Sequence, residues 1–424
     1  MSSINITSYG CSANTADAEI IKGILKRRGF SIVDSPVDSN LNIILTCVVK
    51  TPTEHKMNKR IKRLNKLEKP LIVAGCMPKA MKKQVENMAP EASLVGPDNI
   101  LKIVEAVTLT LGGDRVDFTE GTPDERTCLP RIRENKLVHI QPICTGCLGD
   151  CSYCIVKYAR GRLFSFQPEA IVRDIERAIE DGCREVWVTA EDTAAYNFNG
   201  VRLPQLLRMI TGIPGNFRVR VGMMTPNQLL TIKEDLIEAY KSEKIFKFVY
   251  IPIQSGNNRI LRKMNRRYTV EEFKGIVIDL REIFPLIGIS TDIICGFPSE
   301  TMGEFNDSIE FIKWLKPDVL NISRFWARPG TKAAEMKNRL HGRETKERSR
   351  MLTRIWDDLS IDVGKKWIGW EGEILLDEKG WENTLVGRNY AYKAIGVESQ
   401  VDLGQFINVR VTGSGAGYLE AEIV

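Results

Sequence analysis

The chain has 424 residues, of which 27% are charged and 43% hydrophobic, and its formal net charge is +6. This length is expected to give roughly two to four domains, each with its own core. No apolar run approaches the roughly 20 residues that cross a bilayer, and the first residues lack the basic and apolar segments of a signal peptide. Ten cysteines, several in short motifs, indicate metal ligation in a reducing cytoplasm rather than a disulfide scaffold.

The first hundred residues alternate between short apolar runs and helical patterns. We expect strands at residues 4–9, 41–46 and 71–74, and helices at 15–28 and 56–67. This alternation predicts a parallel sheet covered by helices on both faces. The sequence therefore predicts an N-terminal α/β domain over residues 1–109.

Each of these predicted strands is followed by a cysteine, at Cys11, Cys47 and Cys76. Because the carboxyl ends of parallel strands meet at one edge of a sheet, the three thiols could converge there. Gly10 and Gly75 lie beside two of them and allow the backbone to approach a bulky inorganic group. Three thiolates could hold an iron–sulfur cluster with one iron open. Three buried structural thiols explain the pattern equally well.

Residues 110–136 are rich in glycine, proline and charge and are expected to be a linker that contains Cys128 as a free thiol. Strand and helix patterns resume in residues 137–364. The predicted strands are 138–143, 185–189, 218–223, 246–253, 288–294 and 319–325, and helices are expected near 168–181, 271–284 and 302–315. This order predicts a (β/α)6 partial barrel, whose site should lie at the carboxyl ends of its strands.

A cysteine-rich loop follows the first of these strands. Cys147, Cys151 and Cys154 have C-x3-C-x2-C spacing, and Cys144 forms an overlapping C-x2-C pair with Cys147. Thiolates are the usual ligands of iron–sulfur clusters, and three of them leave the fourth iron of a cubane open. A structural zinc site would need a fourth ligand that the loop does not supply. Cys144 could serve as an alternate ligand or disulfide partner, whereas Cys183 and Cys295 are expected in the core.

The ends of the other predicted strands carry polar side chains that could form the rim of a binding site. They are Glu191, Asp192, Thr225, Asn227, Gln254, Ser255, Asp292, Arg324 and Arg328. Each could alternatively cap a helix or stabilise a turn. Together, on one edge of the barrel, they predict the mouth of the site.

Two groups of basic residues could contact a phosphate backbone or form solvated helix faces. The first comprises Lys56, Lys59, Arg60, Lys62, Arg63, Lys66 and Lys69, and the second comprises Arg259, Arg262, Lys263, Arg266 and Arg267.

After a helix expected at 355–368, residues 365–424 contain short strand patterns at 373–376, 383–387, 393–397, 406–412 and 419–424. They predict a small antiparallel β-barrel. From Lys365 onward the chain has six Lys or Arg and nine Asp or Glu, so this segment is acidic and a phosphate backbone would be attracted chiefly by the other domains. Trp381, Tyr390 and Tyr392 could stack on bases or pack in the core.

The loop containing Cys147, Cys151 and Cys154, with Tyr153 before the last cysteine, resembles the radical S-adenosylmethionine (radical SAM) enzymes. The segments 9–19, 45–54 and 73–78 resemble the three cysteine motifs of the methylthiotransferase branch of that family. The segments 143–154 and 291–298 look most like its archaeal and eukaryotic members, which act on N6-threonylcarbamoyladenosine at position 37 of tRNA. The C-terminal segment resembles the RNA-binding TRAM barrel.

The resemblance implies two [4Fe–4S] clusters. Cys147, Cys151 and Cys154 would hold the one that binds SAM, and Cys11, Cys47 and Cys76 would hold an auxiliary one. It implies that one SAM supplies a methyl group and a second is cleaved to the radical that activates C2 of adenine. The residues expected to bind SAM are Tyr153, Glu191, Asp192, Gln254 and Ser255. No further catalytic residue is implied.

The resemblance also implies a monomer that meets the anticodon stem-loop of tRNA, an electron donor and a sulfur source. Leu45, Ser299, Ala190 and Ala195 depart from the family pattern, and Ser299 replaces a glycine. Isopentenyladenosine at position 37, or an aspartate of a ribosomal protein, is an alternative substrate. A non-catalytic iron–sulfur RNA-binding protein is the alternative of a different class.

Overall fold

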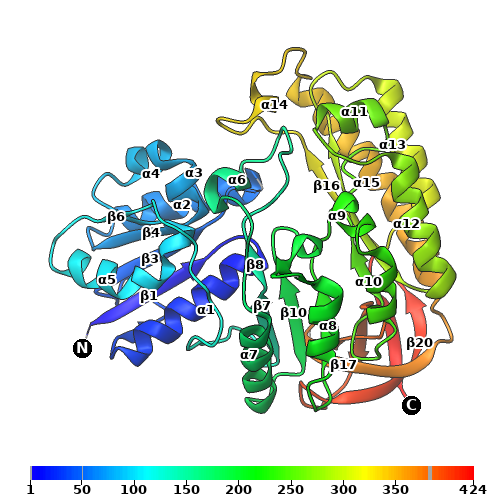
Figure 1. The fold of residues 1–424 in the computed structure, drawn as a ribbon, viewed down its shortest axis with the longest axis horizontal. Coiled ribbons are helices and arrows are strands. Elements are labelled where there is room, and N and C mark those ends of the chain that lie inside the picture. The colour runs from blue at the N-terminus through cyan, green and yellow to red at the C-terminus, as the bar shows by residue number, and fades with distance from the viewer. Residues whose placement is uncertain (1, 50, 381–383) are drawn as a thin grey trace.

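The computed structural model describes residues 2–49, 51–380 and 384–424 (Figure 1). The predicted role of Trp381 in base stacking therefore concerns a residue outside the described ones. Within these ranges, no helix combines the length and the apolar character that crossing a membrane would require.

The N-terminal domain contains a six-stranded parallel sheet in the order β2-β1-β3-β4-β5-β6. Its strands are β1 Ser3–Ser8, β2 Ser31–Val33, β3 Leu41–Thr46, β4 Leu71–Gly75, β5 Ser93–Val95 and β6 Asp117–Phe118. The helices are α1 Ser12–Arg27, α2 Thr51–Asn65, α3 Cys76–Ala80, α4 Lys82–Met88 and α5 Ile103–Leu111, with a 3-10 turn η1 at Pro97–Lys102. The central strands β3 and β4 are buried along their whole length because helices cover both faces. The predicted α/β domain is confirmed, and β6 lies inside the segment expected to be a linker.

The central domain is an open half-barrel formed by two adjacent three-stranded parallel sheets, β13-β10-β7 and β14-β15-β16. Its strands are β7 Val138–Pro142, β10 Glu185–Thr189, β13 Arg218–Val221, β14 Phe248–Tyr250, β15 Gly288–Cys295 and β16 Val319–Arg324. Isolated bridges from Val219 to Ile245 and from Met223 to Tyr250 join the two sheets. The six strands therefore follow chain order around the barrel, as predicted.

Helices surround this half-barrel (Figure 1). They are α6 Val156–Arg160, α7 Pro168–Glu180, α8 Leu203–Thr211, α9 Pro226–Leu230, α10 Lys233–Tyr240, α11 Asn258–Lys263, α12 Val270–Ile283, α13 Met302–Leu315, α14 Lys332–Glu335 and α15 Gly342–Lys365, with a 3-10 turn η2 at Thr193–Ala195. Two short antiparallel pairs join β8 Cys144–Thr145 to β9 Phe164–Ser165, and β11 Asn197–Phe198 to β12 Val201–Arg202. Capping boxes at Thr269 and Thr301 fix the starts of α12 and α13.

Among the predicted boundaries that are wrong, two have a clear explanation. The predicted strand 246–253 is regular only over Phe248–Tyr250, because the apolar residues that follow it form an irregular segment near the barrel mouth. The helix expected at 355–368 begins at Gly342, in a stretch whose charge obscured its helical pattern. Arg343 pairs with Glu347 there, and Arg348 pairs with Glu344, both at the spacing of one helical turn.

The C-terminal domain is a closed five-stranded barrel in the order β17-β18-β19-β21-β20, as expected for a TRAM-like domain. Its strands are β17 Glu371–Lys379, β18 Thr384–Arg388, β19 Ala394–Glu398, β20 Phe406–Ser414 and β21 Leu419–Ile423. It lies against the end of the half-barrel where the strands begin (Figure 1). Tyr392 enters that junction, with its ring centroid 4.8 Å from that of Phe246 and 5.2 Å from that of Phe248. Tyr392 is therefore a packing residue, whereas Tyr390 is partly exposed.

The N-terminal domain docks beside the edge strand β7 and helix α6 of the half-barrel, and buried ion pairs support this contact (Figure 1). Arg160, at the end of α6, donates from Nη2 to Asn14 Oδ1 at 2.8 Å and to Asp17 Oδ2 at 3.0 Å, both on α1. Its Nε lies 3.4 Å from Glu191 Oε1, beyond the end of β10. Arg126 donates to the other oxygen of Asp17 at 2.8 Å. The two arginines and Asp17 are each at most 2% exposed, so the network is shielded from water and salt.

Arg160→Met should destabilise the protein because it keeps most of the side-chain volume but removes the charge that Asp17 and Glu191 face. Breaking a buried ion pair by removing one partner typically costs about 3–5 kcal/mol. We expect a loss of this size in the free energy of unfolding, measured by urea denaturation. Arg162→Met, at an exposed position two residues away, is the control. Equal stability of the two variants would contradict the proposed importance of the network.

The junction with the C-terminal barrel should make stability depend on pH. Burial, together with the nearby Asp377 carboxylate, raises the pKa of Glu185 from 4.5 to about 8. The folded protein therefore holds this proton more tightly than the unfolded chain does. The free energy of unfolding should fall as the pH rises from 4.5 to about 8.

Glu185→Gln should weaken this pH dependence, because a neutral amide replaces the titrating carboxyl group. The melting temperature, measured at pH 5 to 8.5, should fall less steeply for this variant than for the wild type. Glu180→Gln, at the exposed end of α7, is the control and should follow the wild type. A Glu185 variant with the wild-type slope would show that another group causes the dependence.

Candidate active site at the junction of two domains

The loop between β7 and α6 brings the three central cysteines together. The backbone N–H of Gly149 donates to Cys147 Sγ at 3.2 Å. A Cβ atom added to Gly149 would lie 3.2 Å from Cys147 Sγ and 3.7 Å from Cys151 Sγ. Both sulfurs therefore face the same small volume, where this glycine leaves room. Cys154 ends the loop, immediately before Ile155 and α6.

A half-buried arginine faces this loop. Arg266 donates from Nη1 to Cys151 Sγ at 3.2 Å and from Nη2 to the carbonyl oxygen of Pro252 at 3.0 Å. Its guanidinium stabilises negative charge on the sulfur. Arg266 belongs to the second basic group that the sequence suggested for phosphate binding, and the structure directs it inward instead.

The three N-terminal cysteines follow neighbouring strands, as expected. Cys11 precedes α1, Cys47 follows β3, and Cys76 begins α3 directly after β4. Gly10 has φ of 121°, and a Cβ there would lie 2.5 Å from Cys47 Cβ. A side chain at position 10 would therefore clash with Cys47, and only a glycine there lets Cys47 lie so close to the backbone beside Cys11.

Asn14 ties these strand ends together. Its Nδ2 donates to the carbonyl oxygens of Tyr9 at 2.9 Å and Thr46 at 2.7 Å, which fixes the end of β1 against the end of β3. Its Oδ1 accepts from Arg160 and lies 3.9 Å from Cys76 Sγ. Arg160 thus brings a positive charge to the N-terminal cysteines from the domain that carries the other three.

The two cysteine groups meet across one packing contact. Helix α6, which follows Cys154, packs against α3, which begins at Cys76. Ile155 and Ala159 are buried in the same apolar cluster as Cys76 and Met77. This interdomain contact therefore lies between the loop that ends at Cys154 and the helix that begins at Cys76.

Both cysteine groups consist of thiols, which are the usual ligands of iron–sulfur clusters. Burial raises the pKa of Cys76 and of Cys147 to about 12, and that of Cys154 to about 11. Such thiols ionise when a metal binds, because coordination removes the proton. In the part of the chain described, no three Cys, His, Asp or Glu side chains converge tightly enough for a single metal ion. A cubane binds each thiolate on a different iron atom and so takes more widely spaced sulfurs.

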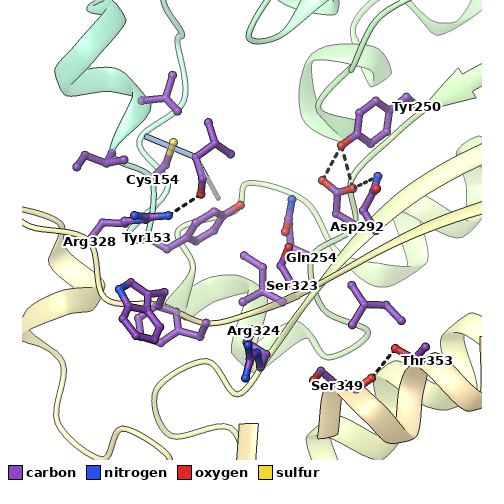
Figure 2. A pocket seen from close by; sticks show the side chains of 18 of the residues that line it. Tyr153, Cys154, Tyr250, Gln254, Asp292, Ser323, Arg324, Arg328, Ser349 and Thr353 are labelled. Atoms are coloured by element: carbon purple, nitrogen blue, oxygen red, sulfur yellow. Dashed lines mark hydrogen bonds between the residues drawn. The ribbon is translucent and has the colours of Figure 1, made fainter. Parts of the chain in front are cut away.

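A cavity of about 610 Å³ opens beside Cys154, between the N-terminal domain and the open edge of the half-barrel. This volume lies within the range of roughly 300–1,000 Å³ that is usual for small-molecule sites. Val49 and His55 line it from the N-terminal domain, and Tyr153 and Gln254 line it from the half-barrel. Figure 2 shows Tyr153 and Cys154 on one side and Tyr250 and Asp292 on another.

The five residues expected at the SAM site fall into three environments. Tyr153 and Gln254 line the cavity. Glu191 pairs with Arg160, whereas Asp192 accepts from the backbone N–H of Thr225 at 3.0 Å and joins the ends of β10 and β13. Burial raises the pKa of Asp192 to about 6, and the Thr225 hydrogen bonds oppose that shift. Ser255 is buried, and its Oγ accepts from the backbone N–H of Asn257 at 3.3 Å.

The remaining cysteines, Cys128, Cys144, Cys183 and Cys295, form no disulfide, and Cys144 lies near Cys147. Cys144, Cys183 and Cys295 are fully buried, and burial raises the pKa of Cys295 to about 12. Cys128 is partly exposed and donates to the carbonyl oxygen of Ala170 at 3.5 Å. This arrangement agrees with core roles for Cys183 and Cys295 and with a free thiol at Cys128.

Sequence reasoning missed two arginines of the site. Arg160 lies in an unremarkable short helix, and Arg266 lies in a run of basic residues. Arg160 lies six residues after the last cysteine of the loop, and this closeness is the sequence feature that could have indicated its role in the site. Nothing local in the sequence separates Arg266 from its basic neighbours.

Comparisons with solved structures show the fold. A radical S-adenosylmethionine methyltransferase, TsrM, from Kitasatospora setae superposes with a TM-score of 0.59 at 15% identity, over 88% of this chain and 81% of that one. The cobalamin-dependent radical enzyme OxsB gives a TM-score of 0.50 at 12% identity, over 84% of this chain and 55% of that one.

Comparisons of sequence show the family. Residues 142–312 match the radical SAM superfamily, and residues 3–96 match a family described as uncharacterized, UPF0004. A protein of Pyrococcus horikoshii named as a probable threonylcarbamoyladenosine tRNA methylthiotransferase is 40% identical over 100% of both chains. The human threonylcarbamoyladenosine tRNA methylthiotransferase is 33% identical over 99% of this chain and 73% of its own length. Full-length similarity, the half-barrel and its cysteine loop agree, and this chain therefore belongs to the threonylcarbamoyladenosine tRNA methylthiotransferases, a family of radical SAM enzymes.

Proposed function

We propose that this enzyme adds a methylthio group to C2 of N6-threonylcarbamoyladenosine at position 37 of tRNA, using two SAM molecules and two [4Fe–4S] clusters. The observation that carries the proposal is the packing of α6 on α3, because α6 follows Cys154, which lines the cavity, and α3 begins at Cys76. Relatives of the same length bear the name of this activity.

Each cysteine group would hold one cluster and leave one iron open. Cys147, Cys151 and Cys154 would hold the cluster that binds SAM, and Cys11, Cys47 and Cys76 would hold the auxiliary one. When bound, SAM and its cluster supply a carbon radical, which suits the unactivated C–H bond at C2 of adenine. The surrounding residues offset negative charge, with Arg266 donating to Cys151 and Arg160 beside Cys76.

SAM would occupy the part of the cavity next to Cys154. Tyr153 and Gln254 would contact it there, since both line this part of the cavity. Glu191 and Asp192 would set the shape of the site from the ends of β10 and β13. Ser255 would contribute through the turn that it stabilises.

The anticodon stem-loop would approach along α2. His55 in this helix lines the cavity, and the basic residues that follow it are exposed at Lys56, Lys59, Lys62, Arg63 and Lys66. Such a row attracts phosphates. The reaction also needs an electron donor and a sulfur source, which we propose to be separate partners in the cell.

Two cysteine substitutions test the roles of the clusters. Cys151→Ala should abolish both reductive SAM cleavage and product. Cys47→Ala should retain some SAM cleavage but form no methylthio product, because only the auxiliary site is removed. The measurements are 5′-deoxyadenosine release and mass spectrometry of nucleosides from tRNA incubated with reconstituted protein, SAM and reductant.

Cys128→Ala is the matched control, because it removes a thiol outside both groups. We expect roughly eight irons per chain for the wild type and this control, and roughly four for the Cys47 variant. Full product formation by the Cys47 variant would refute the second cluster. A content of only about four irons per chain in the reconstituted wild type would refute it as well.

The proposed contact of α2 with RNA phosphates predicts how the affinity for tRNA changes with salt concentration. Replacing Lys59, Lys62 and Lys66 by Gln should weaken tRNA binding and reduce the slope of log K against log salt by about 0.9 for each phosphate that the variant no longer neutralises. Fluorescence anisotropy with labelled tRNA measures both quantities. Replacing Lys26, Lys241 and Lys313, which are exposed on other elements, is the control. Equal slopes for the two triple variants would place the RNA elsewhere.

A further inference from the structure

The cavity contains positively charged side chains with different surroundings. Arg328 pairs with Glu54 and donates to the carbonyl oxygen of Val49 at 2.9 Å, so an interdomain contact engages its guanidinium. Arg324 also lines the cavity and is exposed. Among the residues that the structure describes, it has no side-chain hydrogen bond or ion-pair partner. Arg324 is therefore the arginine of this cavity best able to bind a ligand.

The end of β16 determines where Arg324 points. Asn321 is paired with Asp292 and faces the interior of the half-barrel, where its Nδ2 donates to Asp292 Oδ1 at 2.9 Å. Because side chains alternate along a strand, Arg324 lies on the opposite face, where α15 packs against β16. The cavity thus extends past the edge strand, from the barrel interior to α15 (Figure 2).

Helix α15 adds hydroxyl groups to this part of the cavity. Ser349 and Thr353 are one helical turn apart and both line it. Their hydroxyls donate to the carbonyl oxygens of Lys346 and Ser349, each at 2.9 Å. Each hydroxyl oxygen still has lone pairs, so each can accept a hydrogen bond from a ligand.

The opposite part of the cavity disfavours an anion. The Asp292 carboxylate lies there and accepts from the Tyr250 hydroxyl at 2.9 Å and from Asn321. Two carboxylates close together in a cavity repel one another. An acidic ligand would therefore direct its carboxylate away from Asp292 and toward Arg324.

We propose that Arg324, with Ser349 and Thr353, is the subsite that recognises the threonyl part of the substrate's side chain. This inference rests on the proposed function. The threonylcarbamoyl group ends in a carboxylate and a hydroxyl. The guanidinium can bind that carboxylate in a bidentate manner, and the helix hydroxyls can accept from the ligand's hydroxyl. An isopentenyl group has neither feature, so this subsite selects between the two modified adenosines.

The test compares three anticodon stem-loops that differ only at position 37, which carries the threonylcarbamoyl group, its carboxamide or unmodified adenosine. Affinities for the reconstituted full-length enzyme are measured by fluorescence anisotropy at several salt concentrations. The wild type should prefer the carboxylate over the carboxamide by about 10- to 100-fold. Arg324→Gln should reduce that preference to about threefold or less, and Arg324→Lys should restore part of it.

Arg350→Gln is the matched control, because it removes an exposed charge from α15 outside the cavity lining and should keep the full preference. If Arg324→Gln keeps the full preference for the carboxylate, the proposal is overturned. It is also overturned if this variant binds all three RNAs equally less tightly and with a smaller salt slope, because that pattern indicates a phosphate contact. A wild type that does not distinguish the modified RNA from unmodified adenosine would instead refute the proposed function, and the subsite with it.

Discussion

The junction of the two cysteine-bearing domains depends on one buried guanidinium. Arg160 comes from the half-barrel, yet its hydrogen bonds go to Asn14 and Asp17 of the N-terminal domain. A buried charge is tolerated only where it is paired, so this arginine fixes α1 and α6 relative to one another. Since α6 follows Cys154 and α1 follows Cys11, the same contact fixes the separation of the two cysteine groups.

The active-site cavity follows from this docking. An open half-barrel leaves the carboxyl ends of its strands and the edge of β16 uncovered, and the N-terminal domain closes part of that opening with Val49 and His55. The pairing of Arg328 with Glu54 provides a second link at the same rim. The C-terminal barrel takes no part in this closure because it docks at the other end, where Tyr392 packs on Phe246 and Phe248.

Local patterns in the sequence predicted much of this architecture. The spacing of Cys147, Cys151 and Cys154 needs only one loop, so it could be identified without any tertiary information. The prediction that Cys11, Cys47 and Cys76 follow neighbouring strands required only a parallel sheet. The roles of Arg160 and Arg266 could not be predicted in this way. Their partners lie more than 100 residues away along the chain, at Asp17 and Cys151, and composition alone makes Arg266 resemble an RNA-binding residue.

The boundaries that failed share a physical cause. Side-chain patterns predict which face of an element is buried, but the point where an element ends depends on neighbours from distant parts of the chain. The segment after β14 is apolar enough for a strand, yet it must follow the barrel rim, where Gln254 adopts φ of 72°. Helix α15 begins in a charged stretch because Arg348 is buried against Glu300, with Nη1 2.6 Å from Oε2.

Backbone strain at Ser299, near the barrel mouth, explains the contacts that Arg259 makes. Ser299 has φ of 67°, where a residue other than glycine typically costs about 1–3 kcal/mol. Arg259 stabilises this turn by donating to the carbonyl oxygen of Ser299 at 2.8 Å while it pairs with Glu304. The backbone N–H of Ser299 donates to the carbonyl oxygen of Asn338 at 2.9 Å. Arg259, from the second basic group, thus helps to hold a serine in a backbone conformation that favours glycine.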